Sequence, residues 1–138
     1  MPNKFHLQVD SKLAAAEQVR SWFEQLNQPA IPDKLVWLQC LTLLQEGFIN
    51  IAEHSHKNLP PETPIDIEAV RLDDRIEIRI WSQGPPFDLQ QKLNEIPELE
   101  DNYDERGRGL KIISEWADDF SYDRTEDNRH CLYIMKRY

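Results

Sequence analysis

Three polar side chains recur at intervals of four residues within the stretch 43–58, LLQEGFINIAEHSHKN: they are Glu46, Asn50 and His54. On an α-helix each step of four residues advances only ~40° around the axis, so all three side chains fall within one face ~80° wide. A carboxylate, a carboxamide and an imidazole on one face can bind a cation or move a proton, which makes this face a candidate active surface. An ordinary solvated face of an amphipathic helix is the alternative.

The glycines of the chain are few, so their positions are informative. The sequence contains four, where average usage of about 7% predicts roughly ten; they are Gly47, Gly84, Gly107 and Gly109. Glycine suits a backbone that approaches a ligand closely, and the start of a helix offers unpaired N–H groups to an anion. The run Gly107-Arg108-Gly109 therefore predicts a glycine-rich turn that opens a helix and cradles a phosphate, with Arg106 or Arg108 adding charge. A plain helix-entry turn is the alternative.

The candidate active surface requires a long helix to carry it. We expect this helix to begin near Pro32 and to run to about Lys57, before the Pro60–Pro61 break. Apolar residues with helical spacing fall on its opposite side and predict burial against a core; they are Trp37, Leu41, Leu44, Phe48 and Ile51.

Strand-like alternation appears in five segments, which are residues 4–9, 64–71, 75–82, Asp118–Arg124 and His130–Arg137. The short connections at 72–74 and 126–128 predict that the last four form two antiparallel hairpins. Residues 12–27 predict a further helix, capped by Asp10 or Ser11. This order of elements predicts an α+β fold, a two-layer α/β sandwich with helices on one face of a mixed or antiparallel sheet.

The segment between the two predicted hairpins is less regular. Residues 83–88 predict a loop, because their two prolines can neither continue a strand ladder nor sit inside a helix. Residues 89–106 are polar and acidic, which predicts a short helix and then a mobile stretch. A lid is one use for such a segment.

Length and composition restrict the class of protein. A chain of 138 residues fits a single domain, 1–138, with a sizeable core. A formal net charge of −9 argues against a general nucleic-acid binder, which needs a basic surface. No apolar run approaches the ~18 residues of a membrane span and the N-terminus does not resemble a signal peptide, so we expect a cytoplasmic protein without a membrane partner. Cys40 and Cys131 lie far apart in sequence and favour reduced, buried thiols over a zinc site or a disulfide.

Three motifs occur in one order within this domain: EGFINIAEH at 46–54, SQGPPFD at 82–88 and GRGLKII at 107–113. In these motifs the chain resembles the anti-sigma factor serine/threonine kinases of bacterial partner-switching systems, within the GHKL ATPase superfamily, where they look like the N box, the G1 box and the G2 box. The Pro-Phe-Asp ending of the second motif points to this branch rather than to sensor histidine kinases. The resemblance implies a histidine kinase-like ATPase domain with the Bergerat-type ATP-binding fold.

The resemblance also implies roles for individual residues. Asn50 would coordinate the Mg²⁺ that bridges the nucleotide phosphates, and Glu46 would be the general base that accepts a proton from a substrate hydroxyl. His54 would shape or support the site rather than take a proton. The other residues implied to contact ATP are Ser82, Gly84, Phe87, Arg106, Gly107, Arg108, Gly109 and Leu110, with 89–106 as the ATP lid.

The activity implied by the resemblance is that of an anti-sigma regulatory factor. Such a protein uses ATP and Mg²⁺ to phosphorylate a serine or threonine of a small, STAS-type anti-sigma antagonist protein, and in alternation sequesters a sigma factor or a similar regulator. Dimerisation is common in that family, so a homodimer is an expected state. A nucleotide-independent partner-switching module on the same fold is the alternative function.

Ser82 departs from the family's pattern. The G1 box normally begins with an aspartate, whose carboxylate accepts a hydrogen bond from the adenine amino group. A serine hydroxyl is neutral and shorter, so the loss would approach ~1.5–3 kcal/mol, or about one to two decades in affinity. Three interpretations remain open: weak ATP binding, compensation by water or another side chain, or loss of nucleotide binding with partner binding retained.

Overall fold

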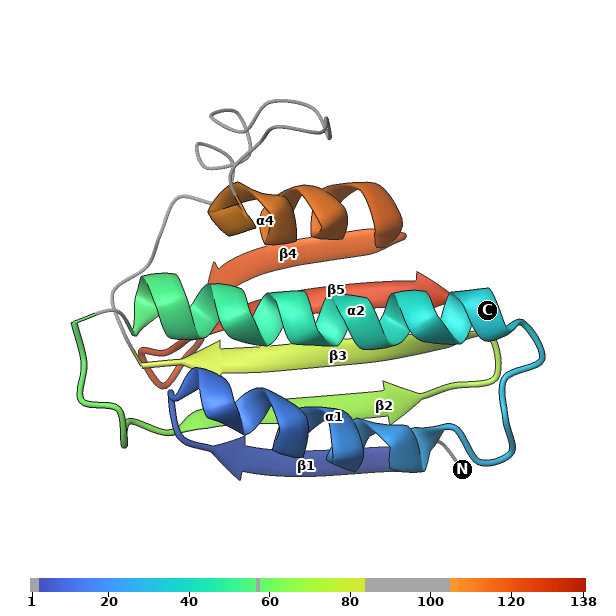
Figure 1. Ribbon diagram of the computed structural model, residues 1–138, viewed down its shortest axis with the longest axis horizontal. Coiled ribbons are helices and arrows are strands. Elements are labelled where there is room, and N and C mark those ends of the chain that lie inside the picture. Colours follow the sequence, from blue (N-terminus) through green and yellow to red (C-terminus); the bar gives the residue numbers. More distant parts are fainter. Residues whose placement is uncertain (1–2, 57, 84–104) are drawn as a thin grey trace.

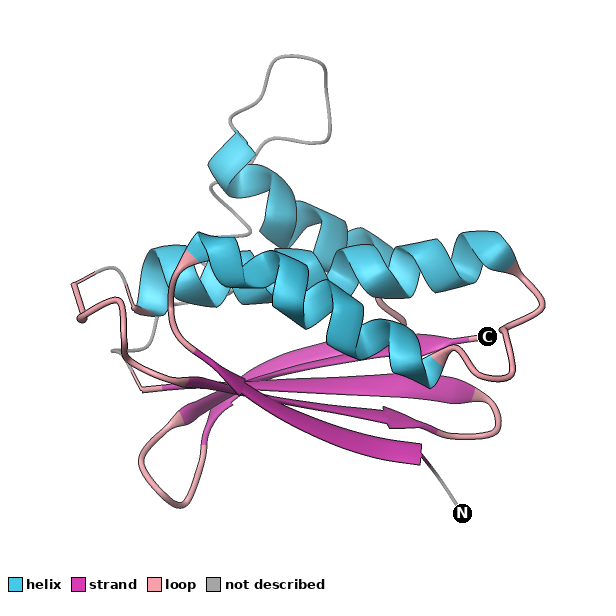
Figure 2. Ribbon diagram, turned by 60° about the horizontal axis from the view of Figure 1, so that its bottom comes forward, coloured by secondary structure: helices cyan, strands magenta, loops and turns pink. Residues whose placement is uncertain are grey.

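The chain folds into two layers, a sheet and a set of helices that cover one of its faces (Figures 1 and 2). The computed structural model describes residues 3–56, 58–83 and 105–138. The elements are, in chain order, β1 (Asn3–Val9), η1 (Leu13–Ala15), α1 (Ala16–Phe23), η2 (Glu24–Leu26), α2 (Lys34–Asn50), η3 (Ile51–Ser55), β2 (Ile65–Arg71), β3 (Arg75–Ser82), α4 (Glu105–Trp116), β4 (Asp119–Arg124) and β5 (His130–Arg137). The predicted α+β sandwich is confirmed.

The sheet has five strands in the order β1-β2-β3-β5-β4, and every pair of neighbours is antiparallel. Both predicted hairpins, β2–β3 and β4–β5, are present. The turn of the second contains Asn128 at φ 66°, a left-handed conformation that asparagine tolerates better than most residues.

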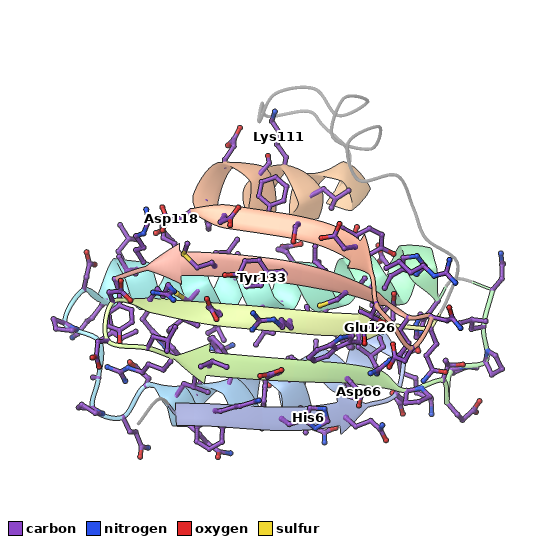
Figure 3. The ribbon with its side chains drawn as sticks, turned by 180° about the vertical axis from the view of Figure 1, so that it is seen from behind. His6, Asp66, Lys111, Asp118, Glu126 and Tyr133 are labelled. Atoms are coloured by element: carbon purple, nitrogen blue, oxygen red, sulfur yellow. The ribbon has the colours of Figure 1, made fainter. Side chains whose placement is uncertain are left out.

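The two faces of the sheet differ in what covers them. On the helix-facing side, alternate residues of β3 are buried, beginning with Ile76, Ile78 and Ile80. The opposite side is seen in Figure 3 without a helical layer. Ion pairs and rings cover that side: Asp66 binds Arg129 at 2.6 Å, and the Tyr133 hydroxyl donates to Glu77 at 3.0 Å. Among the described residues, the main hydrophobic cluster therefore lies between the sheet and the helices.

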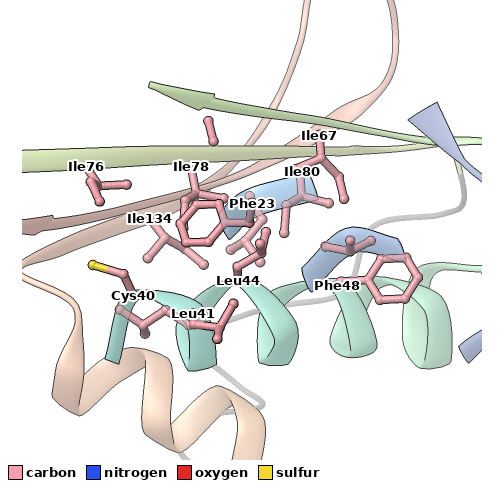
Figure 4. Close-up of a cluster of buried hydrophobic side chains, with 14 of the residues drawn as sticks. Phe23, Cys40, Leu41, Leu44, Phe48, Ile67, Ile76, Ile78, Ile80 and Ile134 are labelled. Atoms are coloured by element: carbon pink, nitrogen blue, oxygen red, sulfur yellow. The ribbon is translucent and has the colours of Figure 1, made fainter. Parts of the chain in front are cut away.

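Helix α2 is the central element of the helical layer. The Asp33 carboxylate caps it by accepting from the N–H groups of Leu35 at 3.0 Å and Val36 at 3.3 Å. All the apolar residues predicted to face the core are buried, at 8% exposure or less, and Figure 4 shows part of this cluster; they are Trp37, Leu41, Leu44, Phe48 and Ile51. The helical stretch Lys34–Glu53 is long and apolar enough to cross a membrane, but 56% of its 18-residue apolar window is buried inside the fold, as in the core helix of a globular domain.

The predicted helix over 12–27 is broken into η1, α1 and η2, and its predicted cap by Asp10 or Ser11 is wrong. Lys12 is the N-cap residue of η1 and makes no side-chain cap. The Asp10 carboxylate accepts from the Lys12 N–H at 3.1 Å in a local turn, while the Ser11 hydroxyl bonds elsewhere. Helix α1 still buries its apolar side, and the Phe23 ring stacks on Trp37 at 5.0 Å.

The two cysteines are free thiols, as predicted. Cys40 is fully buried on α2 and Cys131 is half-buried on β5. Burial raises the pKa of Cys40 to about 12 and the pKa of Cys131 to about 11. Both therefore stay protonated at neutral pH, and neither is an activated nucleophile.

Gly47 is the point where α2 approaches the sheet most closely. A Cβ atom at Gly47 would lie 2.9 Å from the Cδ1 atom of Ile80, 3.2 Å from that of Ile134 and 3.5 Å from Cδ2 of Leu132. Distances this short leave no room for a side chain unless the isoleucines move. Gly47 is therefore a packing glycine, needed for space rather than for a special backbone angle.

We predict that Gly47→Val lowers the free energy of unfolding by about 1–3 kcal/mol, because its side chain overfills the contact with β3 and β5. Urea unfolding measures the change. Gln45→Val is the matched control, since it places the same side chain on the half-exposed side of α2 and should change stability by less than about 0.5 kcal/mol. Equal effects of the two substitutions would contradict the assigned role of Gly47.

Candidate functional site

Asn50 and Glu46 lie one turn apart near the end of α2, as predicted, but they do not form a wet helix face. Asn50 is 4% exposed, and its Nδ2 atom is buried without a hydrogen-bond partner among the described residues. Glu46 is half-buried. The alternative of an ordinary solvated face is therefore wrong for Asn50, which is a buried amide whose nitrogen donates to none of the described residues.

The helix changes character directly after Asn50. Residues 51–55 form the π-helical turn η3, in which the N–H of His56 bonds the carbonyl of Ile51 at 3.0 Å, five residues back. Such widened turns are frequent at functional sites, because they redirect side chains within a helix. His54 lies on this turn; its predicted supporting role stays a prediction.

On the helix-facing side of the sheet, the residues of β3 and β5 change from apolar to polar near the C-terminal end of α2. Gly47 packs over Ile80 and Leu132, which are partners across β3 and β5. The next pair on the same face of the sheet is Ser82 and His130. Helix α2 runs in the same direction as β3 in Figure 1, so Asn50, ~4.5 Å beyond Gly47 along the helix, lies toward the pair. We call Asn50, Ser82 and His130 the polar end of the core.

Ser82 is fully buried at the polar end, with 0% exposure. Its hydroxyl donates a long hydrogen bond, 3.4 Å, to the backbone carbonyl of His130. The position to which the resemblance assigns base recognition is thus occupied by a neutral group that already bonds its own sheet.

Sequence reasoning missed His130, which is half-buried and points to the helical side of the sheet. Its Nδ1 atom is buried with no hydrogen-bond partner among the described residues. Its ring stacks on that of Tyr122 with centroids 5.6 Å apart and planes 21° apart. The signal was present in the alternation of β5, which places residue 130 on the same face as Leu132 and Ile134.

His56 is a second residue that sequence reasoning left without a role. It is 3% exposed; its Nδ1 atom lies 2.6 Å from the Ser11 hydroxyl, and its Nε2 atom accepts from the N–H of Gln83 at 2.9 Å. Ser11 in turn donates to the carbonyl of Thr63 at 2.5 Å. Because Nε2 accepts, the proton of the neutral ring belongs on Nδ1, and every polar atom of the ring is satisfied.

The His56 network ties the end of β3 to the start of the chain. It joins four segments through one imidazole, and Gln83 is the last described residue before the G1 glycine, Gly84. Burial lowers the pKa of His56, because a charged ring would lose its solvation. His56 therefore positions the end of β3 as a neutral group.

The glycine-rich run at 107–109 is not a turn that precedes a helix. Helix α4 begins at Glu105, so Gly107, Arg108 and Gly109 lie inside its first turns. The first four N–H groups of a helix lack an intrahelical acceptor, which includes those of Gly107 and Arg108 and excludes that of Gly109. The start of α4 lies at the same end of the fold as the end of β3 (Figure 1). A phosphate-binding role for this start stays a prediction.

Other predicted contact residues are only partly placed. Leu110 is 1% exposed, so only its backbone could meet a ligand. Arg106 belongs to the first turn of α4. Gly84 and Phe87 lie outside the described residues, as does the predicted lid up to residue 104.

The residues present at the polar end fit a magnesium–phosphate group better than a metal bound by protein alone. Within the described residues no three His, Cys, Asp or Glu side chains cluster closely enough to hold a metal ion. Mg²⁺ in nucleotide sites keeps water and phosphate ligands and needs few protein oxygens. The buried amide of Asn50 could give Oδ1 to such an ion and Nδ2–H to a phosphate oxygen.

We predict that Asn50→Leu, measured without nucleotide, is as stable as the natural chain, or more stable by up to about 1 kcal/mol, because it removes a buried donor that has no partner among the described residues. Asn50→Asp is the comparison, since a buried carboxylate there should destabilise the fold. Urea unfolding without nucleotide tests both. A clear loss of stability in Asn50→Leu would show that Nδ2 is satisfied in the folded protein.

We predict that stability falls as the pH drops below about 6.5, in a step that belongs to His56. The pKa of His56 is lowered in the fold, so its contribution is complete above the unfolded value and is lost as the pH falls through the folded value. Urea unfolding between pH 8 and pH 5 measures it. His56→Gln should flatten this step, whereas His6→Gln, at an exposed side chain, should not. Identical pH profiles for the natural chain and His56→Gln would refute the assignment.

Comparison with known proteins agrees with this arrangement. The pattern of the histidine kinase-like ATPase domain matches residues 9–136. Among solved structures, a chain of the SiaB–SiaC complex from Pseudomonas aeruginosa is similar, with a TM-score of 0.65 over 97% of this chain and 89% of that chain, at 13% sequence identity. At this identity the likeness shows the fold alone. No curated protein matches the chain. Because the matched pattern covers nearly all of the sequence, the chain belongs to the histidine kinase-like ATPase domain family.

Proposed function

We propose that this chain is an ATP- and Mg²⁺-dependent serine/threonine kinase of a partner-switching system. Its substrate would be a small anti-sigma antagonist protein of the STAS type, and in alternation it would sequester a sigma factor or a similar regulator. Membership of an ATPase domain family implies ATP binding, typically with Mg²⁺. The observation that carries the proposal is the buried amide of Asn50, one helical turn after Glu46, whose nitrogen has no hydrogen-bond partner in the part of the chain that the structure describes.

Asn50 is suited to the phosphate end of a nucleotide. A carboxamide is uncharged, so it can be buried at 4% exposure without the cost of an isolated charge. In the proposed complex its Oδ1 atom would hold the Mg²⁺ and its Nδ2–H would bond a phosphate oxygen. Both atoms of the amide would then be satisfied, whereas none of the described residues bonds Nδ2.

Glu46 is suited to the proton transfer. It lies four residues before Asn50, ~6 Å along the helix axis, which is within the span between a metal-bound phosphate and the attacking hydroxyl. It is half-buried rather than sealed, so a substrate side chain can approach it. As general base it would accept the proton of the serine or threonine as the phosphoryl group is transferred.

The second candidate function is a nucleotide-independent binding module on the same fold. The burial of Ser82 favours it, because a fully buried hydroxyl that bonds its own sheet offers little to a base. Both functions require a protein partner. The similar solved chain comes from a two-protein complex, which supports partner binding for this chain too.

We predict that Glu46→Gln lowers phosphotransfer by about 10²–10⁴-fold and leaves Mg-ATP affinity nearly unchanged, because the amide cannot accept the proton. Asn50→Ala should instead weaken Mg-ATP binding itself. The antagonist protein is first isolated by co-purification, and transfer of label from γ-labelled ATP is then measured. Gln45→Ala, on the neighbouring half-exposed position, is the control. A Glu46→Gln protein with full kinase activity would rule out the assigned base.

We predict that the natural chain binds Mg-ATP weakly and that Ser82→Asp binds it about 10- to 100-fold more tightly, because a carboxylate restores a charge-assisted bond to the base. Isothermal titration calorimetry measures both affinities. No binding by the natural chain, with recovery in Ser82→Asp, would select the nucleotide-independent module.

A further inference from the structure

We propose that His56 is a positioning residue of the nucleotide site, and that its neutral ring holds the chain where β3 leads into the G1 motif. Protonation of the ring releases this hold and weakens Mg-ATP binding. The proposal rests on the proposed nucleotide binding and adds to it a dependence on pH that comes from one buried histidine.

The first observation is the direction of the hydrogen bonds around the His56 ring. The Ser11 hydroxyl donates its only proton to the carbonyl of Thr63 at 2.5 Å, so in the 2.6 Å contact between Ser11 and Nδ1 the ring is the donor. At the other side of the ring, Nε2 accepts from the N–H of Gln83 at 2.9 Å. Both ends of the network therefore require the same tautomer, with the proton on Nδ1 and a lone pair on Nε2.

A second proton on the ring is incompatible with this arrangement. It would place Nε2–H against the N–H of Gln83, two donors whose nitrogens lie 2.9 Å apart. The contact between Nδ1 and Ser11 would survive, because Nδ1 already donates there. Protonation therefore breaks one particular bond of the network, which is the bond to the end of β3.

The second observation is where this bond lies relative to the sheet. The ladders that pair β3 with β2 and with β5 end at Trp81 and Ser82, respectively. Gln83 lies beyond both ladders, and its N–H bonds the imidazole of His56 instead of a strand. Gly84 of the G1 motif follows directly in the sequence. His56 therefore fixes the backbone at the point where the chain leaves the sheet for this motif.

The third observation is that His56 directly follows the helical element that carries Asn50. Helix α2 continues into η3, and the N–H of His56 closes this turn on the carbonyl of Ile51 at 3.0 Å. The ends of α2 and β3 lie at the same side of the fold in Figure 1, and the bond from His56 to Gln83 joins them. A nucleotide that contacts both the N box and the G1 box depends on their relative position, so loss of this bond lowers its affinity.

The groups around the ring leave the response to His56 itself. The network consists otherwise of a hydroxyl, a carbonyl and a backbone N–H, which do not change charge near neutral pH. Among the described residues, the titratable ones on the segments around the ring are Asp10, Lys12, Glu53, His54 and Glu62. Aspartate, glutamate and lysine ordinarily change charge outside the range from pH 5 to pH 8. Burial lowers the pKa of His56, so the ring is neutral at pH 7.

The test is the pH dependence of nucleotide affinity. Isothermal titration calorimetry measures the affinity of the natural chain, His56→Gln and His6→Gln for Mg-ATP between pH 8 and pH 5, within the range in which circular dichroism shows each protein to be folded. Glutamine offers a side-chain oxygen that can accept from Gln83 and does not titrate. His6→Gln is the matched control, because His6 is an exposed histidine that pairs with Asp66 on the opposite side of the sheet. Protonation of ATP itself affects all three proteins equally.

We expect the three proteins to bind with similar affinity at pH 8. As the pH falls through the pKa of His56, the natural chain and His6→Gln should lose about tenfold in affinity relative to His56→Gln, the worth of one hydrogen bond. The same pH dependence in the natural chain and in His56→Gln would overturn the proposal while nucleotide binding stands. If the natural chain does not bind Mg-ATP even at pH 8, the proposal and the proposed kinase function both fall.

A second measurement needs no variant. Nuclear magnetic resonance spectra of the histidine side chains give separate pKa values for His56 and His54 in the natural chain, with and without saturating Mg-ATP. Because proton binding and nucleotide binding are reciprocally linked, Mg-ATP should lower the pKa of His56 by about one unit, the counterpart of a tenfold change in affinity. The backbone amide proton of Gln83 should shift with the same midpoint as the ring. A pKa of His56 that Mg-ATP leaves unchanged, or a Gln83 amide that does not follow the ring, would overturn the proposal.

Discussion

The close approach of α2 to the sheet at Gly47 determines where every other part of the candidate site lies. A glycine there lets the helix backbone reach Ile80 and Ile134 directly, at distances that a side chain would prevent. The approach fixes the position of α2 along β3, and so places Asn50 toward the Ser82–His130 pair. A helix held further from the sheet would leave room for water between them, and the amide of Asn50 would lose its buried character. The N-box glycine is thus part of the site through packing alone.

The buried polar groups at this end of the fold fall into two kinds. His56 is fully satisfied: Ser11 and Gln83 bond both its ring nitrogens, and Thr63 completes the chain of hydrogen bonds. Such a closed network stabilises the junction of four segments and has no capacity for a ligand. Asn50 and His130 each keep one buried atom without a partner among the described residues. The difference separates a positioning group from groups that can recognise a ligand, and burial alone does not reveal it, because His56 and Asn50 are buried to nearly the same extent.

Much of the fold could be predicted from the sequence because its signals are local. Alternation predicted both hairpins, and helical spacing predicted the buried side of α2. The predicted start of this helix, near Pro32, lies two residues before the observed start at Lys34. The errors arose where contacts are long-range. The Ser11 hydroxyl was expected to cap a helix one residue on, but it bonds His56 and Thr63, 45 and 52 residues away. Local propensity carries no information about such partners.

The same limit explains which features of the candidate site could not be predicted from the sequence. The spacing of Glu46 and Asn50 placed both residues on one face of the helix, but spacing cannot distinguish a solvent-exposed face from one that the end of a sheet covers. The position of His130 could be read from alternation only once its register with Ser82 was known. A lone histidine in a strand gives no such register by itself. The early start of α4 at Glu105 also contradicts the expectation that glycines mark a helix boundary, because glycine lowers helix stability without forbidding it.

The serine at position 82 has a physical consequence for the ligand-free protein. An aspartate at a position with 0% exposure would bury a charge beside the backbone carbonyl of His130, and only a ligand could offset that cost. The serine hydroxyl instead donates to this carbonyl, so position 82 is neutral and has a hydrogen-bond partner without nucleotide. The core can therefore pack at position 82 without a bound base. Under the proposed function, a surface that binds a partner protein would therefore keep its shape whether or not ATP is present, and nucleotide would act near Glu46 and Asn50 rather than on the integrity of the domain.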